Sequence, residues 1–170
     1  FKALSILRQQ GLEFEYVLIG DGEENATVMA ALKENGLEDV TTLTGTIAHE
    51  EVLGHYRRAH LFVLGCEIAK NGDRDGIPNV IAESMAMGVP VAATNVSGIP
   101  ELIENGCTGL TVGSKDPEAL AGIMERLLTD QELRQTVIPE ARKKVEAVFD
   151  NKVLIRKLAD VYRAEGLGPR

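Results

Sequence analysis

Two carboxylates flank the start of a helix in the middle of the chain. Asp75 lies in a polar segment, and Glu83 follows eight positions later, beyond a Gly-Ile-Pro-Asn turn. Pro78 suits the first turn of a helix, because the N–H that proline lacks would have no partner there. The spacing therefore predicts a loop carboxylate in front of a helix and a second carboxylate on its first turns.

The backbone at this helix start can do chemistry of its own. We expect the N–H groups of Asn79, Val80 and Ile81 to be unpaired at the positive end of the helix dipole, where anions and above all phosphate bind. Glu83 lies four residues beyond Asn79 on the same helical face, so that Asp75 and Glu83 could reach either side of a phosphate and accept from sugar hydroxyls. For an isolated pair of acids, complementing the dipole or lining a solvated face is the commoner role.

Composition limits the classes to which such a site could belong. The chain has 170 residues, 44% of them hydrophobic and 26% charged, which fits one globular domain over residues 1–170. The formal net charge is −8, and no run of Lys and Arg is longer than three residues. Nucleic acid is an unfavourable partner for such a chain, because phosphate-backbone binding depends on cationic neutralisation.

The cysteines and the apolar segments indicate a cytoplasmic location. Cys66 and Cys107 have neither the spacing of metal ligands nor that of a disulfide framework. No apolar run approaches the roughly twenty residues needed to span a bilayer. The chain opens inside an amphipathic helical pattern without a cap or an initiating Met, which we interpret as a fragment of a longer protein.

Strand and helix patterns alternate along the chain, which predicts an α/β fold with a doubly wound, Rossmann-like parallel sheet and C-terminal helices. Ligands of such sheets bind at the carboxyl ends of the strands. Pro139 should kink or divide the helix that contains it. The expected strands are 13–20, 39–45, 60–66, 89–94 and 108–112, and the expected helices are 24–36, 49–59, 78–87, a short one from 99, 116–128, 131–149 and 151–165.

These motifs, in this order, resemble a known family. The run DGIPNVIAESMAMGVPVAATNVSGIPELIENGCTGLTV is similar to the donor-binding half of retaining GT-B glycosyltransferases of family 4, the glycosyl transferases group 1. The similarity extends upstream through LTGTIAHEEVLGHYRRAHLFVLGC and VLIGDG, so that it covers nearly the whole chain. It implies that the fold is the C-terminal half of a GT-B enzyme.

The resemblance also implies roles for individual residues in binding a nucleotide-diphosphate sugar. The family has an acidic pair in its catalytic donor site: Glu83 matches the member that holds the ribose hydroxyls, and Asp75 matches the member, usually Glu, that approaches the transferred sugar. The amides after Pro78 would cover the diphosphate, and the base would lie beside Gly45 and Thr46. The donor-binding positions carried over in this way are Gly20, Gly22, Gly45, Thr46, Gly76, Pro78, Asn79, Val80, Glu83, Gly98 and Glu101.

The same resemblance implies what this chain would need from elsewhere. The Arg and Lys that neutralise the diphosphate in the family would precede Phe1, and the acceptor site would lie on a missing N-terminal domain, to which helix 151–165 would cross. Any peripheral association with a membrane would involve that domain only. We expect no cofactor and no metal, because the helix amides can stabilise the charge that builds on the departing diphosphate. Alone, the fragment should bind the donor weakly and transfer nothing.

Two other function classes stay open at this stage. A non-catalytic nucleotide-binding or phosphosugar-binding module, or a regulatory domain of the response-regulator kind, would share the fold, although Asp21 is the only Asp at a strand end and lacks paired acids before it. A GT-B epimerase acting on the same nucleotide sugars also has this fold.

Overall fold

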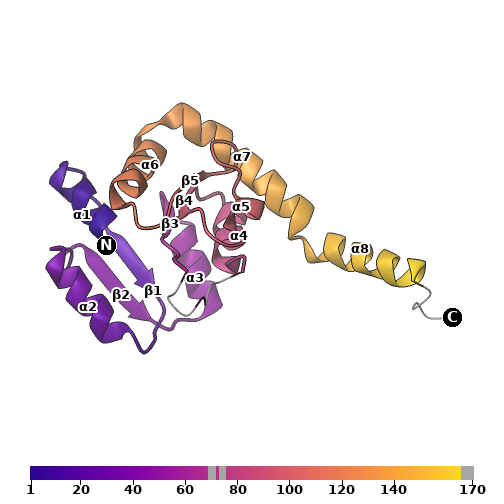
Figure 1. Ribbon diagram of the computed structural model, residues 1–170, viewed down its shortest axis with the longest axis horizontal. Coiled ribbons are helices and arrows are strands. Elements are labelled where there is room, and N and C mark those ends of the chain that lie inside the picture. The colour runs from indigo at the N-terminus through magenta and orange to yellow at the C-terminus, as the bar shows by residue number, and fades with distance from the viewer. Residues whose placement is uncertain (69–71, 73–75, 166–170) are drawn as a thin grey trace.

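The computed structural model describes residues 1–68, 72 and 76–165. Helices and strands alternate through the first two thirds of the chain, and three longer helices follow (Figure 1). The elements are α1 (Lys2–Gln9), β1 (Tyr16–Ile19), α2 (Asn25–Glu34), β2 (Thr41–Gly45), α3 (His49–Tyr56), β3 (Phe62–Leu64), α4 (Asn79–Ala86), β4 (Val91–Thr94), α5 (Ile99–Leu102), β5 (Leu110–Val112), α6 (Pro117–Thr129), α7 (Gln131–Val148) and α8 (Asn151–Ala164).

All the pairings between these strands are parallel, as the alternation predicts. They form two ladders: β1 pairs with β2, and β3, β4 and β5 pair in that order. Within the part of the chain that the structure describes, β1 and β3 therefore each have a single strand partner. The sequence predicted parallel strands correctly but did not predict that the sheet would separate into two ladders.

Strand β4 shows how helices cover both faces of the larger ladder. All four of its residues are buried. Ala92 packs into a cluster with side chains of α1, α6 and α7, whereas Val91 and Ala93 pack into a second cluster with side chains of α4, α5 and α7. Because successive side chains of a strand point to opposite faces, β4 lies between these two clusters. Burial on both faces is typical of parallel strands in α/β folds.

The last helix stands apart from this core. Figure 1 shows α8 projecting away from the rest of the molecule. None of its residues is buried, and its apolar side chains Leu154, Ile155, Leu158 and Val161 are exposed. The helix predicted over 151–165 is therefore present, and these four apolar side chains face solvent.

Two predictions about prolines are changed by the structure. Pro78 is the N-cap of α4, with extended backbone (φ −64°, ψ 121°), and the helix begins at Asn79 rather than at Pro78. Pro139 lies inside α7, which is continuous from Gln131 to Val148, so it does not divide the helix, and a kink at Pro139 stays a prediction. Among the described residues, no helix combines the length and apolar character that crossing a membrane requires.

Candidate functional site

Packing fixes the orientation of α4, the helix that carries the predicted site. One face is buried through Ile81, Ala82, Ser84 and Met85, and the helix packs against α7 and the neighbouring strands. Asn79 and Val80 are exposed and Glu83 is half-buried. Since residues three and four apart share a helical face, burial of the first set turns the second toward the surface. The structure therefore brings Asn79, Val80 and Glu83 together, as the sequence predicts.

The N-terminus of α4 leaves two backbone donors unpaired. Among the described residues, no side chain caps this helix, and the N–H groups of Asn79 and Val80 have no hydrogen-bond partner. The prediction that the Ile81 N–H is also free is wrong: it donates to the Pro78 carbonyl at 3.1 Å. Because Pro78 is the N-cap, its carbonyl accepts the first bond of the helix, so the anion-binding end consists of two amides rather than three.

The N-termini of the three longer helices, α6, α7 and α8, differ from that of α4 because each has a side-chain cap. Asp116 accepts a hydrogen bond from the N–H of Ala119 at 2.8 Å, and Asp130 and Asp150 likewise cap α7 and α8 through their carboxylates. A capping carboxylate satisfies an N–H and places negative charge where an anion would bind. The first turn of α4 carries no acidic residue. Its free donors are therefore available to an external anion.

Tyr56 contacts the helix beside Glu83, a neighbour that the sequence did not reveal. Its hydroxyl donates to the Val80 carbonyl at 3.1 Å and lies 3.4 Å from Glu83 Oε2. Burial raises the pKa of Tyr56, and the charge of Glu83 and the contact with its carboxylate raise it further. The hydroxyl is therefore a protonated donor at neutral pH.

The two glycine turns predicted at the donor site adjoin each other. The Gly20 N–H donates to the Gly45 carbonyl at 3.0 Å, and both residues have positive φ, at 132° and 65°. Asp21 accepts from the Gly22 N–H at 2.8 Å and from the side-chain amide of Asn25, so it organises the turn. A Cβ on Gly22 would meet nothing within 4 Å. The structure thus gives Gly20 and Gly45 a conformational reason to be glycine and leaves open space beside Gly22.

Gly98 supports the segment in front of α4. Its N–H donates to the Gly76 carbonyl at 3.2 Å, and a Cβ on Gly98 would lie 2.6 Å from Ile77 Cγ1. Glu101 is exposed on α5. The structure therefore places Gly98 against the turn that leads into Pro78, and the predicted donor contacts of Gly98, Gly76 and Glu101 stay predictions.

The described contacts leave untested the predicted roles of Asp75 and Thr46 and the expectation of a metal-free site. Asp75 lies outside the described residues, and Thr46 is exposed after β2. Among the described residues, no three or more His, Cys, Asp or Glu side chains are grouped so that they could hold a metal ion.

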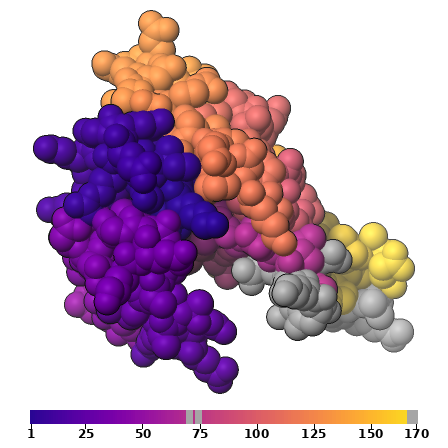
Figure 2. All heavy atoms as spheres, turned by 60° about the vertical axis from the view of Figure 1, so that its left-hand side comes forward, coloured from indigo at the N-terminus to yellow at the C-terminus, as the bar shows by residue number. Residues whose placement is uncertain are grey.

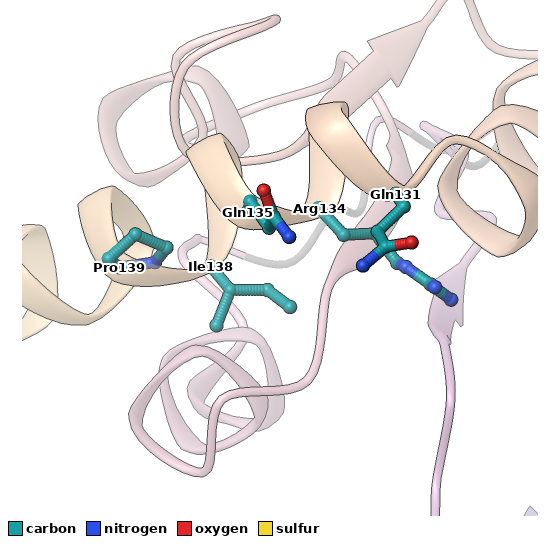
Figure 3. Close-up of a pocket in the computed structure, with 5 residues that line it drawn as sticks. All are labelled: Gln131, Arg134, Gln135, Ile138 and Pro139. Atoms are coloured by element: carbon teal, nitrogen blue, oxygen red, sulfur yellow. The ribbon is translucent and has the colours of Figure 1, made fainter.

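The described part of the surface carries an open depression of about 310 Å³ on α7, where Gln131, Arg134, Gln135, Ile138 and Pro139 line it (Figure 3). In Figure 2 the orange helix α6, which precedes α7, lies beside the indigo helix α1. Ile138 Cγ2 is 3.8 Å from the position of a Cβ on Gly88, just beyond the C-terminal end of α4. The depression is therefore at the opposite end of α4 from the free amides.

Replacing Gly98 with alanine tests the packing in front of α4. We expect Gly98→Ala to lower the free energy of unfolding by about 1–3 kcal/mol, because the new Cβ overlaps Ile77 and lies 3.1 Å from the Gly76 carbonyl oxygen. Urea unfolding measures the change. Gly113→Ala is the matched control, since a Cβ there meets nothing within 4 Å. Equal stability of Gly98→Ala and the native chain would contradict the close packing.

The raised pKa of Tyr56 predicts a loss of stability at alkaline pH. An unfolded tyrosine releases its proton near its ordinary pKa of 10.0, whereas folded Tyr56 retains it. The contribution of Tyr56 is thus fully present below pH 10 and is lost as the pH rises above it. Between pH 8 and pH 11, the native chain should lose up to about 1 kcal/mol more unfolding free energy than Tyr56→Phe. Equal losses in urea unfolding at the two pH values would show that Tyr56 titrates normally.

Comparison with known proteins assigns the family. The family model described as glycosyl transferases group 1 matches residues 1–144. The amylovoran biosynthesis glycosyltransferase AmsK of Erwinia amylovora is 39% identical over 160 residues, which cover 94% of this chain and 39% of AmsK. The chain thus spans about two fifths of the length of this relative.

Two solved structures show the same fold. Sucrose-phosphate synthase from Thermosynechococcus elongatus superposes with a TM-score of 0.78 at 25% identity, over 96% of this chain and 41% of the synthase. HepE from Anabaena, in complex with UDP, superposes with a TM-score of 0.80 at 23% identity, over 95% of this chain and 43% of HepE. The chain belongs to the glycosyl transferases group 1 family, and its fold is that of the Rossmann-like C-terminal domain of a GT-B glycosyltransferase.

Proposed function

We propose that this chain is the donor-binding half of a retaining glycosyltransferase that uses a nucleoside-diphosphate sugar. The observation that carries the proposal is the exposed N-terminus of α4, where two unpaired amides, of Asn79 and Val80, lie within one turn of the Glu83 carboxylate. Amides at a positive helix end suit a diphosphate, and a carboxylate suits a pair of ribose hydroxyls. The UDP complex of HepE, a protein of the same fold, supports a nucleotide ligand.

Each group then has a role in sugar transfer. Negative charge builds on the diphosphate as the bond to the sugar breaks, and the Asn79 and Val80 N–H groups stabilise that charge where it develops. Glu83 fixes the ribose, which orients the rest of the donor. Asp75 approaches the transferred sugar in this proposal. The amides require no metal ion for this role, which leaves a metal-free donor site as a prediction.

A partner domain is the second part of the proposal. In a doubly wound sheet whose six strands, counted along the chain, lie in the order 3-2-1-4-5-6, the first strand is central and has a neighbour on each side. The two observed ladders are both parallel, and a further strand placed between β1 and β3 would join them into one sheet. If that strand came first in the chain, β1 to β5 would be the second to sixth strands, and the sheet would have this order. We infer that a longer protein supplies this strand, the basic residues that follow it in the family, and an acceptor domain.

The exposed surface of α8 supports the same inference. Leu158 and Val161 are 55% and 59% exposed, an unusual position for large apolar side chains on neighbouring turns. Contact with an N-terminal domain of the same protein would cover them. In this proposal the donor half alone binds nucleotide and transfers no sugar, and a cytoplasmic location stays a prediction.

Family membership favours a transferase over the other function classes. Several relatives that match most of this chain, AmsK and two WcaL proteins among them, are named as glycosyltransferases. The response-regulator alternative would need grouped acids at a strand end, whereas Asp21 is engaged in the turn with Gly22 and Asn25.

Substitution of Glu83 tests the proposal. We expect the chain to bind one of UDP, GDP or ADP without Mg²⁺, and Glu83→Gln to weaken that binding about 10- to 100-fold, because hydrogen bonds from the ribose to a charged acceptor are lost. Calorimetric titration with each nucleotide, with and without Mg²⁺, measures the effect and identifies the preferred base.

The control is Glu125→Gln, which makes the same change on the exposed surface of α6 and should leave affinity within about twofold. Two outcomes contradict the proposal: binding of no nucleoside diphosphate by the native chain, or equal affinity in the native chain and Glu83→Gln.

A further inference from the structure

Tyr56 is the side chain that connects α3 to the donor end of α4. It is the last residue of α3, and its ring lies 6.0 Å from the ring of Phe62 on β3, measured between centroids. The residue is only 7% exposed. The ring is therefore held by packing, and the hydroxyl has little freedom to choose other partners.

The hydroxyl is shared between the backbone and the carboxylate of the proposed site. It has one proton to donate, and two acceptors face it: the Val80 carbonyl at 3.1 Å and Glu83 Oε2 at 3.4 Å. The single proton is shared between the two acceptors, and the longer contact, with Glu83, is the weaker of the two. Among the described contacts, the only hydrogen bond of the Glu83 carboxylate to the protein is the one that Oε2 accepts from Tyr56.

The other carboxylate oxygen is left for a ligand. Within the described part of the chain, Glu83 Oε1 has no hydrogen-bond partner. A carboxylate whose one oxygen is anchored presents the other in a defined direction, and this lowers the entropy lost on binding. A vicinal diol, as in a ribose, can then donate to an acceptor that is already oriented.

We propose that Tyr56 is a positioning residue of the donor site, whose hydroxyl orients the Glu83 carboxylate toward the ribose. The inference rests on the proposed function, because it takes the ribose as the group that Glu83 binds. Tyr56 does not touch the ligand in this account. It acts through Glu83, so its effect should appear only with ligands that carry a ribose.

Tyr56→Phe isolates the hydroxyl, since phenylalanine retains the ring that packs on Phe62. We expect the variant to bind the preferred nucleoside diphosphate about three- to tenfold more weakly, and to bind inorganic pyrophosphate within about twofold of the native chain. In the Glu83→Gln background, adding Tyr56→Phe should change nucleotide affinity less than twofold, because the group it orients is already altered.

Tyr16→Phe provides the matched control, because Tyr16 is a half-buried tyrosine whose ring packs on Phe1 instead. It should leave affinity for the nucleotide unchanged. Calorimetric titration measures the affinities for nucleotide and for pyrophosphate. It is done with the native chain, both single tyrosine variants, Glu83→Gln and the double variant, which together give a double-mutant cycle. Thermal unfolding of each variant separates loss of fold from loss of binding.

The outcomes distinguish this inference from the proposed function. Suppose that Glu83→Gln weakens nucleotide binding but Tyr56→Phe does not, or that Tyr56→Phe weakens the binding of pyrophosphate and of nucleotide equally. In either case Tyr56 has a packing role, so the inference is overturned while the proposed function stands. An undiminished effect of Tyr56→Phe in the Glu83→Gln background also overturns it. If the native chain binds no nucleoside diphosphate, both fall together.

Discussion

The burial of one face of α4 is the constraint on which the site depends. Ile81 and Met85 are completely inaccessible, and they place the helix between the sheet and α7. Because the helix cannot rotate without exposing them, Asn79, Val80 and Glu83 must face outward. The same packing keeps the N-terminus of the helix at the surface, where its two free amides can meet an anion.

The elements around α4 reinforce this arrangement from three directions. Tyr56 contacts its first turn from α3, and Gly98 packs against the segment that precedes Pro78. Under the helix, strand β4 contributes Ala92 and Ala93, which are both fully buried. Their small side chains let helices pack closely on both faces of the sheet. The described part of the proposed site therefore consists of backbone amides and the Glu83 carboxylate on a closely packed support, an arrangement suited to stabilising charge without reorganisation.

Much of this could be predicted from the sequence, because the signals were local. The alternation of apolar strands and amphipathic helices predicted parallel pairing, and the spacing of Pro78 and Glu83 predicted which groups would meet on α4. Asp116 caps α6 through its side chain, a role typical of Asp directly before a helix. These features depend on residues within a few positions of one another, where helix geometry fixes the relation.

The features that could not be predicted depend on distant contacts or on competition between small local energies. Tyr56 and Glu83 are 27 positions apart, and no periodicity links them. Pro78 can occupy either the N-cap or the first helical position, and the structure selects the N-cap, with the consequence that the Ile81 amide is paired. Pro139 lies inside α7, where it costs the helix a backbone hydrogen bond, between the buried residues Val137 and Ala141, which pack this part of the helix on the core.

The most direct test of the donor site is to follow backbone amide resonances by NMR while the chain is titrated with a nucleoside diphosphate and, separately, with inorganic pyrophosphate. The account predicts saturable shifts of the Asn79 and Val80 amides with both ligands, and a shift of the Glu83 side-chain carboxyl with the nucleotide only. Shifts confined to the depression on α7, or none at Asn79 and Val80, would contradict it.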